Sequence, residues 1–396
     1  MTLADRELAP SPQETKPPDF TRRVYGLLGI PLDQVTIDET TARIEQSIFS
    51  RQRLVWSTPN MNNLAAAQID AQFRDVLAAS DLCTADGMPI VGLCWLLGIP
   101  VRERVAGSST FDRMLYRPYE RQISVFFFGG AEGVAELACT RLDQLSCSMR
   151  SAGHYYPGFG SIESMSEEPV IERINAAKPD LLILSLGTAR GHEWIRRNAA
   201  RLDVPVIAHL GSVVNFMAGV VQRAPPLLGR LGLEWAWRIL QEPHLARRYY
   251  SDFCALVALL AKKVLPTMAQ RALQLSGAEQ EPSLSITSKD GTHLIELTGS
   301  WNDGHLNPLR VSLEQATRVP ADLVIDLGRV TSFGAGFIGL LLIARTHQLN
   351  VGLQFRLQRC PSRIARMFRI NGSAHLLSEA VGTDSPDTRK NTSAHA

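Results

Sequence analysis

The chain has 396 residues, of which 45% are hydrophobic and 20% are charged, and its formal net charge is +2. This composition is that of a globular protein with a substantial core, and the length predicts about two domains. The near-neutral charge excludes an overall polyelectrolyte character, so any cationic function has to be local.

The six cysteines are scattered and include no Cys-x-x-Cys pair. Most sit in apolar segments, which favours buried thiols in a reducing compartment over disulfides or a metal site. The polar, Pro-rich residues 1–20 are interpreted as a disordered leader and not as a signal peptide. No run approaches the roughly 18 apolar residues that span a bilayer. We therefore expect a cytoplasmic protein that can still touch a membrane.

The first ordered domain is predicted over residues 21–222. Its opening elements lead to Val55, which reads as part of a buried strand, and Asn60 is a good N-cap for the helix that follows. Thr58 and Asn60 are small polar residues at a strand's carboxyl end, where open α/β sheets bind ligands.

Asp86 ends the next apolar run, and no basic residue lies within five positions on either side. A carboxylate in such a setting tends to have a raised pKa and can serve as a general base. A simpler interpretation is also open, in which Thr58 and Asn60 only form a cap and Asp86-Gly87 only forms a turn.

Strands and helices alternate further along this domain, which predicts a mostly parallel sheet. Residues 87–98 are apolar on nearly all sides, so this helix is expected to be buried. Gly129 and Gly130 follow the buried strand Ile123–Phe128, where glycines let backbone N–H groups approach a phosphate. A tight turn alone explains these glycines about equally well.

A later strand ends in residues 187–191, which we expect to form a loop before the next helix. Thr188 and Arg190 stand in this loop, at a strand end that suits ligand binding. His192 and His154 are also near strand ends, but a single histidine is usually structural, so neither is assigned a catalytic role.

Residues 223–275 are predicted to form a basic helical appendage close to a membrane. Residues 223–271 hold eight Lys and Arg against three acids, a local net charge of +5. Helices that mix Trp, Tyr, Leu and Arg fit a membrane interface, and each cation near an anionic leaflet is worth about 1 kcal/mol. The cations assigned to the membrane or to a membrane-bound substrate are Arg230, Arg247 and Arg248. A solvated basic face is the alternative, and nucleic acid is disfavoured because no reader motif accompanies the charge.

A linker and a small α/β domain over residues 284–380 follow, and residues 381–396 are interpreted as a disordered tail. In this domain the expected strand around Leu323–Asp326 precedes an expected helix over Gly336–Thr346. The chain is therefore predicted to be α/β throughout, with a mostly parallel sheet domain, a basic helical appendage and a second, smaller α/β domain.

Several motifs of the first domain and the appendage occur together in a fixed order. They are Gly29-Ile30-Pro31, Thr58-Pro59-Asn60, Ala85-Asp86-Gly87, Arg104-Val105-Ala106-Gly107, Gly129-Gly130, Trp194-Ile195, Arg223-Ala224-Pro225, Gly232-Leu233-Glu234-Trp235, Arg238 and Gln241-Glu242-Pro243. Through them, residues 23–250 resemble the WecG/TagA/CpsF family of bacterial glycosyltransferases.

The resemblance implies an inverting, metal-independent transfer of N-acetylmannosamine or a related hexose from a UDP-sugar to a polyprenyl-diphosphate-linked sugar. Such a reaction serves exopolysaccharide, capsule or other cell-surface polysaccharide synthesis at the inner face of the cell membrane. It implies that Asp86 is the base, that Thr58 lies beside it, and that the UDP-sugar is a co-substrate with no further cofactor. The implied substrate-binding residues are Asn60, Arg104, Gly129, Gly130, Thr188, Arg190, Arg223 and Arg238.

The first domain has no Asp-x-Asp pair, which is the usual carboxylate pair for a metal-bound nucleotide sugar. This feature of the sequence agrees with a metal-independent reaction. Leaving-group charge must then be met by Arg side chains and backbone donors. Two positions depart from the family, since its Gln corresponds to Gly191 and its later Asp to Asn215. These departures leave open the sugar and also a degenerate transferase that acts as a scaffold. An unrelated nucleotide-dependent oxidoreductase, suggested only by Gly129-Gly130, lacks the expected acidic residue.

The stretches Leu323–Leu327, Val330-Thr331 and Gly339–Leu341 resemble a STAS domain, the fold of anti-sigma-factor antagonists. In that family a phosphorylatable Ser or Thr follows an Asp at the start of a helix. The corresponding stretch Phe333–Gly336 has neither a hydroxyl nor a carboxylate. The resemblance therefore implies a module that docks a protein partner, dimerises or senses a nucleotide, without a phosphoryl switch.

Overall fold

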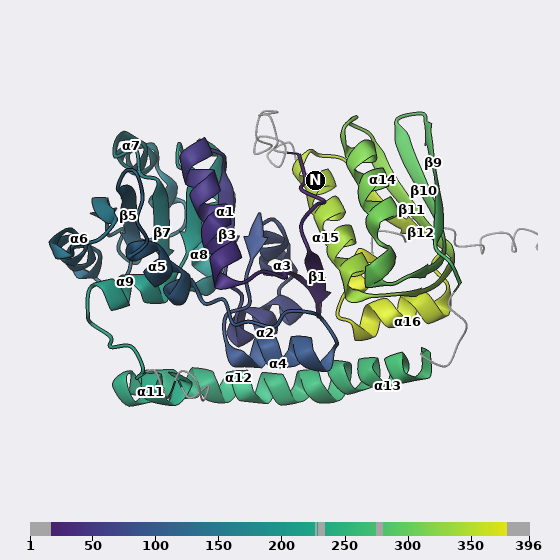
Figure 1. Ribbon diagram of the computed structural model, residues 1–396, viewed down its shortest axis with the longest axis horizontal. Helices are drawn as coiled ribbons and strands as arrows, with labels where there is room; N and C mark the ends of the chain where they lie inside the picture. The colour runs from purple at the N-terminus through teal and green to yellow at the C-terminus, as the bar shows by residue number, and fades with distance from the viewer. Residues whose placement is uncertain (1–16, 226–227, 229–233, 275–279, 378–396) are drawn as a thin grey trace, which may run out of the picture.

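The computed structural model describes residues 17–225, 228, 234–274 and 280–377. They form a larger N-terminal domain, a helical appendage and a smaller C-terminal domain, with the appendage running along one side of both (Figure 1). Most of the expected leader and the whole expected tail lie outside the described residues.

The larger domain is built on a six-stranded sheet in which all neighbouring strands are parallel. In spatial order the strands are β4 (Leu82–Cys83), β3 (Leu54–Ser57), β8 (Val206–His209), β7 (Leu181–Ser185), β5 (Ile123–Gly129) and β6 (Met149–Tyr155). All residues of β5 are buried, which accounts for its continuous apolar run. Because the strands are parallel, their carboxyl ends meet at one edge, as a ligand-binding α/β sheet requires.

Helices cover both faces of this sheet, and each face has its own hydrophobic cluster. One face carries α1 (Ile37–Ser50), α5 (Gly107–Leu115), α6 (Val134–Gln144) and α9 (Gly211–Met217), and the other carries α7 (Glu168–Ala176) and α8 (Thr188–Asn198). The expected loop over residues 187–191 is wrong, because α8 begins at Thr188. Gly187 adopts φ 77° and turns the chain directly from β7 into the helix.

Three further helices, α2 (Met61–Ile69), α3 (Ala71–Ala78) and α4 (Met88–Leu96), follow β3 and β4. The expectation that α4 is buried all round is wrong. Its inner side is buried in a cluster with α2 and α3, but Met88 is 49% and Trp95 is 79% exposed. An apolar run shows only that a helix has no polar face, and here no other element covers the outer side.

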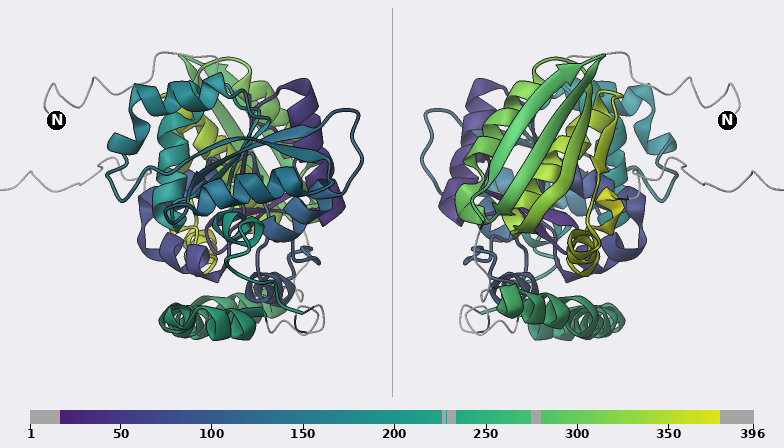
Figure 2. Two further views of the ribbon diagram at one scale, coloured as in Figure 1. Left: turned by 90° about the vertical axis from the view of Figure 1, so that its left-hand side faces the viewer. Right: turned by 90° about the vertical axis from the view of Figure 1, so that its right-hand side faces the viewer.

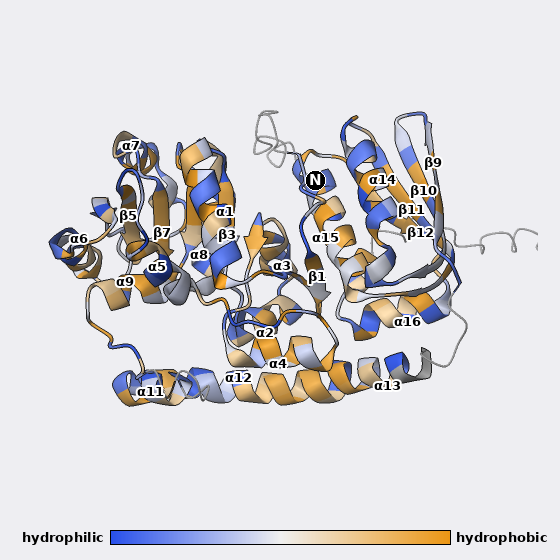
Figure 3. Ribbon diagram, viewed as in Figure 1, coloured by the Kyte–Doolittle hydropathy of each residue, from blue (hydrophilic) through white to orange (hydrophobic). Residues whose placement is uncertain are grey.

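The appendage consists of α11 (Glu234–Gln241), α12 (Ala246–Leu259) and α13 (Leu265–Gln274). The π-helical turn η5 (Leu260–Val264) joins α12 to α13, so that the two form one rod beneath both domains (Figure 1). Apolar residues dominate the later part of α12 and the neighbouring α4 (Figure 3). The helical character expected for residues 223–275 is confirmed over residues 234–241 and 243–274, whereas residues 223–225 are not helical.

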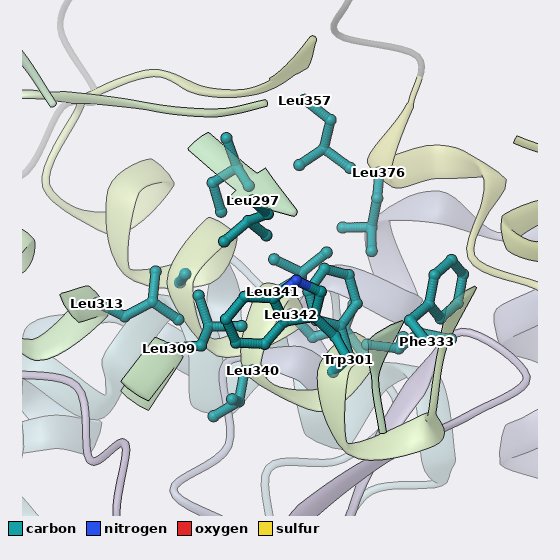
Figure 4. Close-up of a cluster of buried hydrophobic side chains, with 14 of the residues drawn as sticks. Leu297, Trp301, Leu309, Leu313, Phe333, Leu340, Leu341, Leu342, Leu357 and Leu376 are labelled. Carbon is teal, nitrogen blue, oxygen red and sulfur yellow. The ribbon is translucent and has the colours of Figure 1, made fainter. Parts of the chain in front are cut away.

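The smaller domain has a four-stranded sheet in the order β12-β11-β10-β9, seen from the outside in the right-hand view of Figure 2. Its elements are β9 (Ser283–Lys289), β10 (Thr292–Trp301), α14 (Asn307–Thr317), β11 (Asp322–Phe333), α15 (Ala335–Asn350), β12 (Phe355–Gln358) and α16 (Ser362–Ile370). The core lies between this sheet and its helices (Figure 4). Each strand and helix expected from the sequence of this domain is present.

A short hairpin of β1 (Val24–Leu27) and β2 (Ile30–Asp33) precedes the large sheet and is not part of it. The hairpin packs against α15 of the smaller domain. Residues at the start of the first domain therefore connect it to the second one.

Candidate active site

Asp86 lies at the carboxyl edge of the large sheet, directly after β4. The Thr84 N–H donates to the Ser57 carbonyl (3.0 Å), and the Asp86 N–H donates to the Pro59 carbonyl (3.1 Å). The two strand extensions thus run side by side, which brings Asp86 next to the segment that contains Thr58. Gly87 then adopts φ 105° and starts α4. The sequence predicts Asp86 at the end of an apolar run, and the structure shows that this run contains the short strand β4.

Asp86 lines a cavity of about 540 Å³ that lies between the large domain and the appendage. The large domain contributes Asn60, Met61, Asp86, Gly87, Met88, Pro89, Arg104, Ala106, Ser108, Ser212 and Phe216. The appendage contributes Glu234, Trp235, Arg238, Ile239, Ala246, Arg248, Tyr249, Tyr250, Asp252, Phe253 and Leu256. The cavity therefore exists only because the appendage lies across the sheet edge.

The charged residues of the cavity gather around Asp86. Burial raises the pKa of Asp86 to about 6, while the cations Arg104 and Arg238 lower this pKa and Glu234 raises it. Arg104 donates to Glu234 across the cavity at 2.5 Å. The raised pKa agrees with the sequence-based expectation, although Asp86 is not in an uncharged setting, because the fold brings two arginines from distant positions.

Asn60 has two roles in the geometry. Its side-chain oxygen accepts the Asn63 N–H at 3.1 Å and so caps α2, and the residue also lines the cavity. Thr58 is half-buried and is not among the residues that line the cavity, and a Cβ added at Gly107 would lie 3.4 Å from its methyl group. The cap interpretation is confirmed for Asn60, and the roles of both residues toward a substrate stay predictions.

Arg223 and Arg238 both stack on the ring of Phe216, at 5.0 and 6.0 Å from its centroid. Arg238 lines the cavity and also pairs with Glu242 at 2.9 Å. Arg223 lies outside the lining and donates to Asp112 at 2.7 Å. Arg223 therefore secures the chain where it enters the appendage, whereas Arg238 faces the cavity.

Four residues expected to bind substrate lie at the same sheet edge but outside this cavity: Gly129, Gly130, Thr188 and Arg190. Both glycines have positive φ (91° and 87°), and the Gly130 N–H donates to the Ser185 carbonyl at 2.7 Å, so the tight turn is present. Arg190 donates to the Gly160 carbonyl on another loop. The structure does not bring these four together with Asp86, and their binding roles stay predictions.

The position of Gly191 has a local explanation. A Cβ at this position would overlap the ring of His209, which ends β8, so a larger side chain does not fit while His209 stands there. His209 lies beside His192, with ring centroids 4.8 Å apart, and burial lowers the pKa of both imidazoles. Both rings are therefore neutral at physiological pH.

Arg248 lines the cavity and stacks on Tyr249 at 5.1 Å, whereas Arg247 is exposed outside the lining. Arg230 lies outside the described residues. The sequence predicts no role for Glu234 or Phe216, although Glu234 belongs to the motif Gly232-Leu233-Glu234-Trp235. Only the pairing of Glu234 with Arg104, far away in the chain, reveals its place.

Among the described residues, no three His, Cys, Asp or Glu side chains come together as a metal ion would require. In the same part of the chain, no helix is both long enough and apolar enough to cross a bilayer.

Parallel α/β sheets bind ligands at the carboxyl ends of their strands, and a carboxylate of raised pKa among arginines at this edge suits group transfer from a phosphorylated substrate. The family model for the "Glycosyl transferase WecG/TagA/CpsF family" matches residues 25–270, more than half of the chain. The chain belongs to this family and is a glycosyltransferase. A second family model, "Mlab, STAS domain", matches residues 284–378, and we refer to the smaller domain as the STAS module.

Similar curated proteins come from Staphylococcus aureus. One from strain MW2, named N-acetylglucosaminyldiphosphoundecaprenol N-acetyl-beta-D-mannosaminyltransferase, is 25% identical over 221 residues, which cover 54% of this chain and 84% of the relative. Proteins of the same name from strains NCTC 8325 / PS 47 and COL are 26% identical over 219 residues, 54% of this chain and 83% of each relative. The match takes up most of each relative, so none has room for an added STAS module.

Proposed function

We propose that the protein transfers N-acetylmannosamine or a related hexose from a UDP-sugar to a polyprenyl-diphosphate-linked sugar. The transfer inverts the anomeric configuration, uses no metal ion, and takes place at the cytoplasmic face of the cell membrane in exopolysaccharide, capsule or other cell-surface polysaccharide synthesis. The observation that carries the proposal is one cavity in which Asp86, three arginines and a wall of aromatic side chains meet.

Asp86 is the general base in this proposal. Its pKa of about 6 leaves the carboxylate ionised at neutral pH but basic enough to take a proton from a sugar hydroxyl. The acceptor oxygen then forms a bond to the anomeric carbon as the bond from that carbon to the UDP oxygen breaks. The proton goes to Asp86 and the electron pair leaves with UDP. A single displacement of this kind inverts the configuration.

Arg104 and Arg238 are suited to the negative charge that develops on the departing diphosphate. Both lie close enough to Asp86 to change its pKa, and both line the cavity. Preorganised cations in a partly dehydrated site can stabilise a leaving group without a metal. Glu234 holds Arg104 when no substrate is bound, so the incoming diphosphate must compete with this carboxylate for the guanidinium.

The aromatic side of the cavity suits a lipid-linked acceptor. Trp235, Tyr249, Tyr250 and Phe253 of the appendage line it, and Tyr250 and Phe253 are also 71% and 62% exposed. These two side chains therefore mark the place where the cavity opens to the surface. A polyprenyl chain can enter along apolar side chains while its diphosphate sugar reaches the charged cluster.

The surface around this opening is apolar and flanked by cations, as an interfacial membrane site requires. We name it the apolar face, and it comprises the exposed Met88, Trp95, Trp235, Leu240, Tyr250, Phe253, Val257, Leu265 and Met268. Large exposed apolar patches on a protein surface mark interaction sites, and these side chains all belong to α4, α11, α12 and α13. Arg247 and Arg248 lie next to it on α12 and suit an anionic leaflet.

The test of the proposed reaction incubates the purified protein with a panel of UDP-sugars and a short-chain polyprenyl-diphosphate N-acetylglucosamine, and it follows UDP release. We expect turnover with UDP-N-acetylmannosamine or a close relative, and product with the opposite anomeric configuration to the donor. Chelation with EDTA should leave the rate unchanged. Turnover that depends on a divalent ion would remove the metal-free mechanism.

Membrane association is tested by flotation with liposomes that contain anionic lipid. Binding should weaken with added salt and with the pair Arg247→Glu and Arg248→Glu, because each cation contributes about 1 kcal/mol. Trp95→Ser with Phe253→Ser should weaken it at every salt concentration, because these side chains contribute apolar burial. Equal flotation of the wild type and both variants would reject this surface.

A degenerate transferase that acts as a scaffold is the second candidate, and Gly191 favours it. The site of an expected amide has no side chain, and His209 occupies the adjoining space. Absence of turnover with every donor in the panel, by a protein that still floats with liposomes, would support this candidate over the transferase.

A further inference from the structure

Helix α15 of the STAS module is covered on two sides. Eleven of its residues are buried, from Gly336 through Arg345 together with Gln348. One side packs into the module's own core, and the other packs against the β1–β2 hairpin and α3 of the large domain. The helix is therefore an interface within the chain, and this side of it is closed to an outside partner.

Two glycines allow the close approach of β1 to α15. A Cβ at Gly339 would overlap the Val24 carbonyl, and a Cβ at Gly26 would overlap the side chain of Ile338. The hydrophobic clusters are continuous across the contact, because Phe20 and Val24 belong to the cluster of the STAS core. The two domains thus share a core at this point and are not joined only by a linker.

Polar contacts fix the same joint at both margins. Arg345 of α15, whose side chain is 10% exposed, pairs with Asp75 of α3 at 2.8 Å. Arg310 of α14 donates to the carbonyl of Arg22 at 2.7 Å and to that of Phe20. Part-buried, directional contacts of this kind define one relative orientation of the two domains.

The appendage also reaches the STAS module. The rod of α12, η5 and α13 lines the active-site cavity at one end and a second cavity of about 630 Å³ at the other, where α13 faces α16 and the start of α15. Here Arg271 of α13 donates to the Leu97 carbonyl at the end of α4 (2.9 Å). In the described part of the appendage, only Leu259 and Val264 are buried. Both lie near the middle of the rod, in the hydrophobic cluster with α2, α3 and α4, whereas α13 and η5 contact α16 of the STAS module. The rod is therefore held at its middle by the large domain and at its far end by the STAS module.

We propose that the STAS module is an intramolecular clasp whose binding partner is the large domain and appendage of its own chain. By holding the hairpin through α15 and α13 through α16, the module keeps α11 and α12 across the Asp86 cavity, to which they contribute Glu234 and Arg238. The significance of this closure rests on the proposed function, but the closure itself does not.

The test compares hydrogen exchange in the full-length wild type and two full-length variants. Gly339→Ala places a methyl group against the Val24 carbonyl and opens the joint, whereas Gly304→Ala, in the same module, meets no atom within 4 Å and is the matched control. We expect amides of residues 234–259 to exchange about tenfold faster in Gly339→Ala than in the wild type, together with those of β1. Gly304→Ala should match the wild type.

Faster exchange in β1 with unchanged exchange in residues 234–259 would overturn the clasp. If Gly339→Ala unfolds the module, seen as loss of protection in β10 and β11, then Asp75→Ala decides instead, because it removes the ion pair from the exposed side of the joint. Faster exchange of residues 234–259 in this variant, by about threefold, supports the proposal, and unchanged exchange rejects it.

Exchange is measured without turnover, so its result is independent of the transferase assay. A protein that releases no UDP with any donor, yet loosens residues 234–259 when the joint is opened, would keep the clasp and reject the proposed reaction. A protein with normal turnover, in which residues 234–259 keep the wild-type exchange rate when the joint is opened, would keep the proposed reaction and reject the clasp.

Discussion

The active-site cavity and the STAS module each hold a carboxylate beside the first turn of a helix, and the two carboxylates do different work. Asp86 precedes α4, and Asp303, in the 3-10 turn η6 (Asp303–His305), lies against the start of α15. Burial raises the pKa of both carboxyl groups. Burial next to a helix start is therefore not enough to identify a catalytic acid or base.

The hydrogen bonds separate the two cases. The Asp303 carboxylate accepts the Gly336 N–H at 2.8 Å, and a Cβ at Gly334 would lie 2.5 Å from the same oxygen. This carboxylate satisfies the helix start, and the stretch Phe333–Gly336, which lacks a carboxylate of its own, receives one from a distant position. The Asp86 carboxylate accepts no hydrogen bond from any described residue and faces a cavity, so it remains available for a substrate.

The largest expected effect contrasts the two carboxylates directly. Asp86→Asn should lower kcat for UDP release by at least about 100-fold, because a general base contributes 10²–10⁴-fold. Asp303→Asn keeps an oxygen that can accept the Gly336 N–H and should change kcat by less than about twofold. Steady-state UDP release measures both, and equal losses in the two variants would contradict the distinction.

The arginines sharpen the same comparison. Arg271 and Arg310 lie close enough to Asp303 to lower its pKa, as Arg104 and Arg238 do for Asp86, so the test is whether a cation beside Asp86 acts on the reaction. Arg238→Met should reduce kcat by about 100-fold through loss of charge stabilisation on the leaving diphosphate. Arg196→Met is the matched control, since Arg196 pairs with Glu193 on the surface of α8. A loss in Arg238→Met that appears only in KM would show that the guanidinium binds the ground state and the transition state equally.

The pH dependence of the reaction should report the pKa of Asp86. With a pKa of about 6, the carboxylate is ionised above this pH and protonated below it. The rate should therefore be constant at pH 7–8 and fall by about tenfold per pH unit below pH 6. Measurement of kcat/KM from pH 4.5 to 8.5 tests for this fall in rate at acidic pH. The residual rate of Asp86→Asn should not show the fall.

The difference in unfolding free energy between Asp86→Asn and the wild type should depend on pH, with a sign that the pKa shift of Asp86 defines. The folded pKa of about 6 exceeds the ordinary value of 3.8, so the charged form is disfavoured in the fold and wild-type stability falls as pH rises from about 4 to 6. Asp86→Asn should therefore be more stable than the wild type by about 3 kcal/mol at pH 8 and nearly equal to it at pH 4. Chemical unfolding at both pH values measures this difference.

The smallest expected effect concerns the carboxylate of the STAS module. Asp303→Ala should be about 1 kcal/mol less stable than Asp303→Asn, because alanine leaves the Gly336 N–H without its acceptor at the start of α15. Unfolding followed by fluorescence measures the difference at one pH. Equal stability of the two variants would show that the hydrogen bond does not hold the helix start.

Much of the fold could be predicted because its signals are local. The continuous apolar run of β5, the cap at Asn60 and the alternation of strands with helices each depend on neighbours in the chain. The strands and helices of the STAS module were also predictable, since each is bounded by turn residues. The turn at Gly187 was not anticipated, because a single glycine with φ 77° replaced the expected loop.

The candidate site was predicted only in part, for a physical reason. Asp86 and Asn60 stand at strand ends that the chain order already indicates. Glu234 reaches Arg104 only because the appendage folds back across the sheet edge. No pattern of neighbouring residues in the sequence predicts this contact. The outer side of α4 was misjudged for the same reason, since exposure depends on which elements arrive to cover it.

The sequence by itself determined the family, the order of the elements and the carboxylate at the end of β4, because motifs and periodicity act over short stretches of chain. The tertiary structure alone decided which arginines surround Asp86, which side of α4 stays exposed, and that α15 binds its own chain through Gly339 and Arg345. These properties depend on packing between segments far apart in the sequence, where small differences in shape and charge select one contact among many.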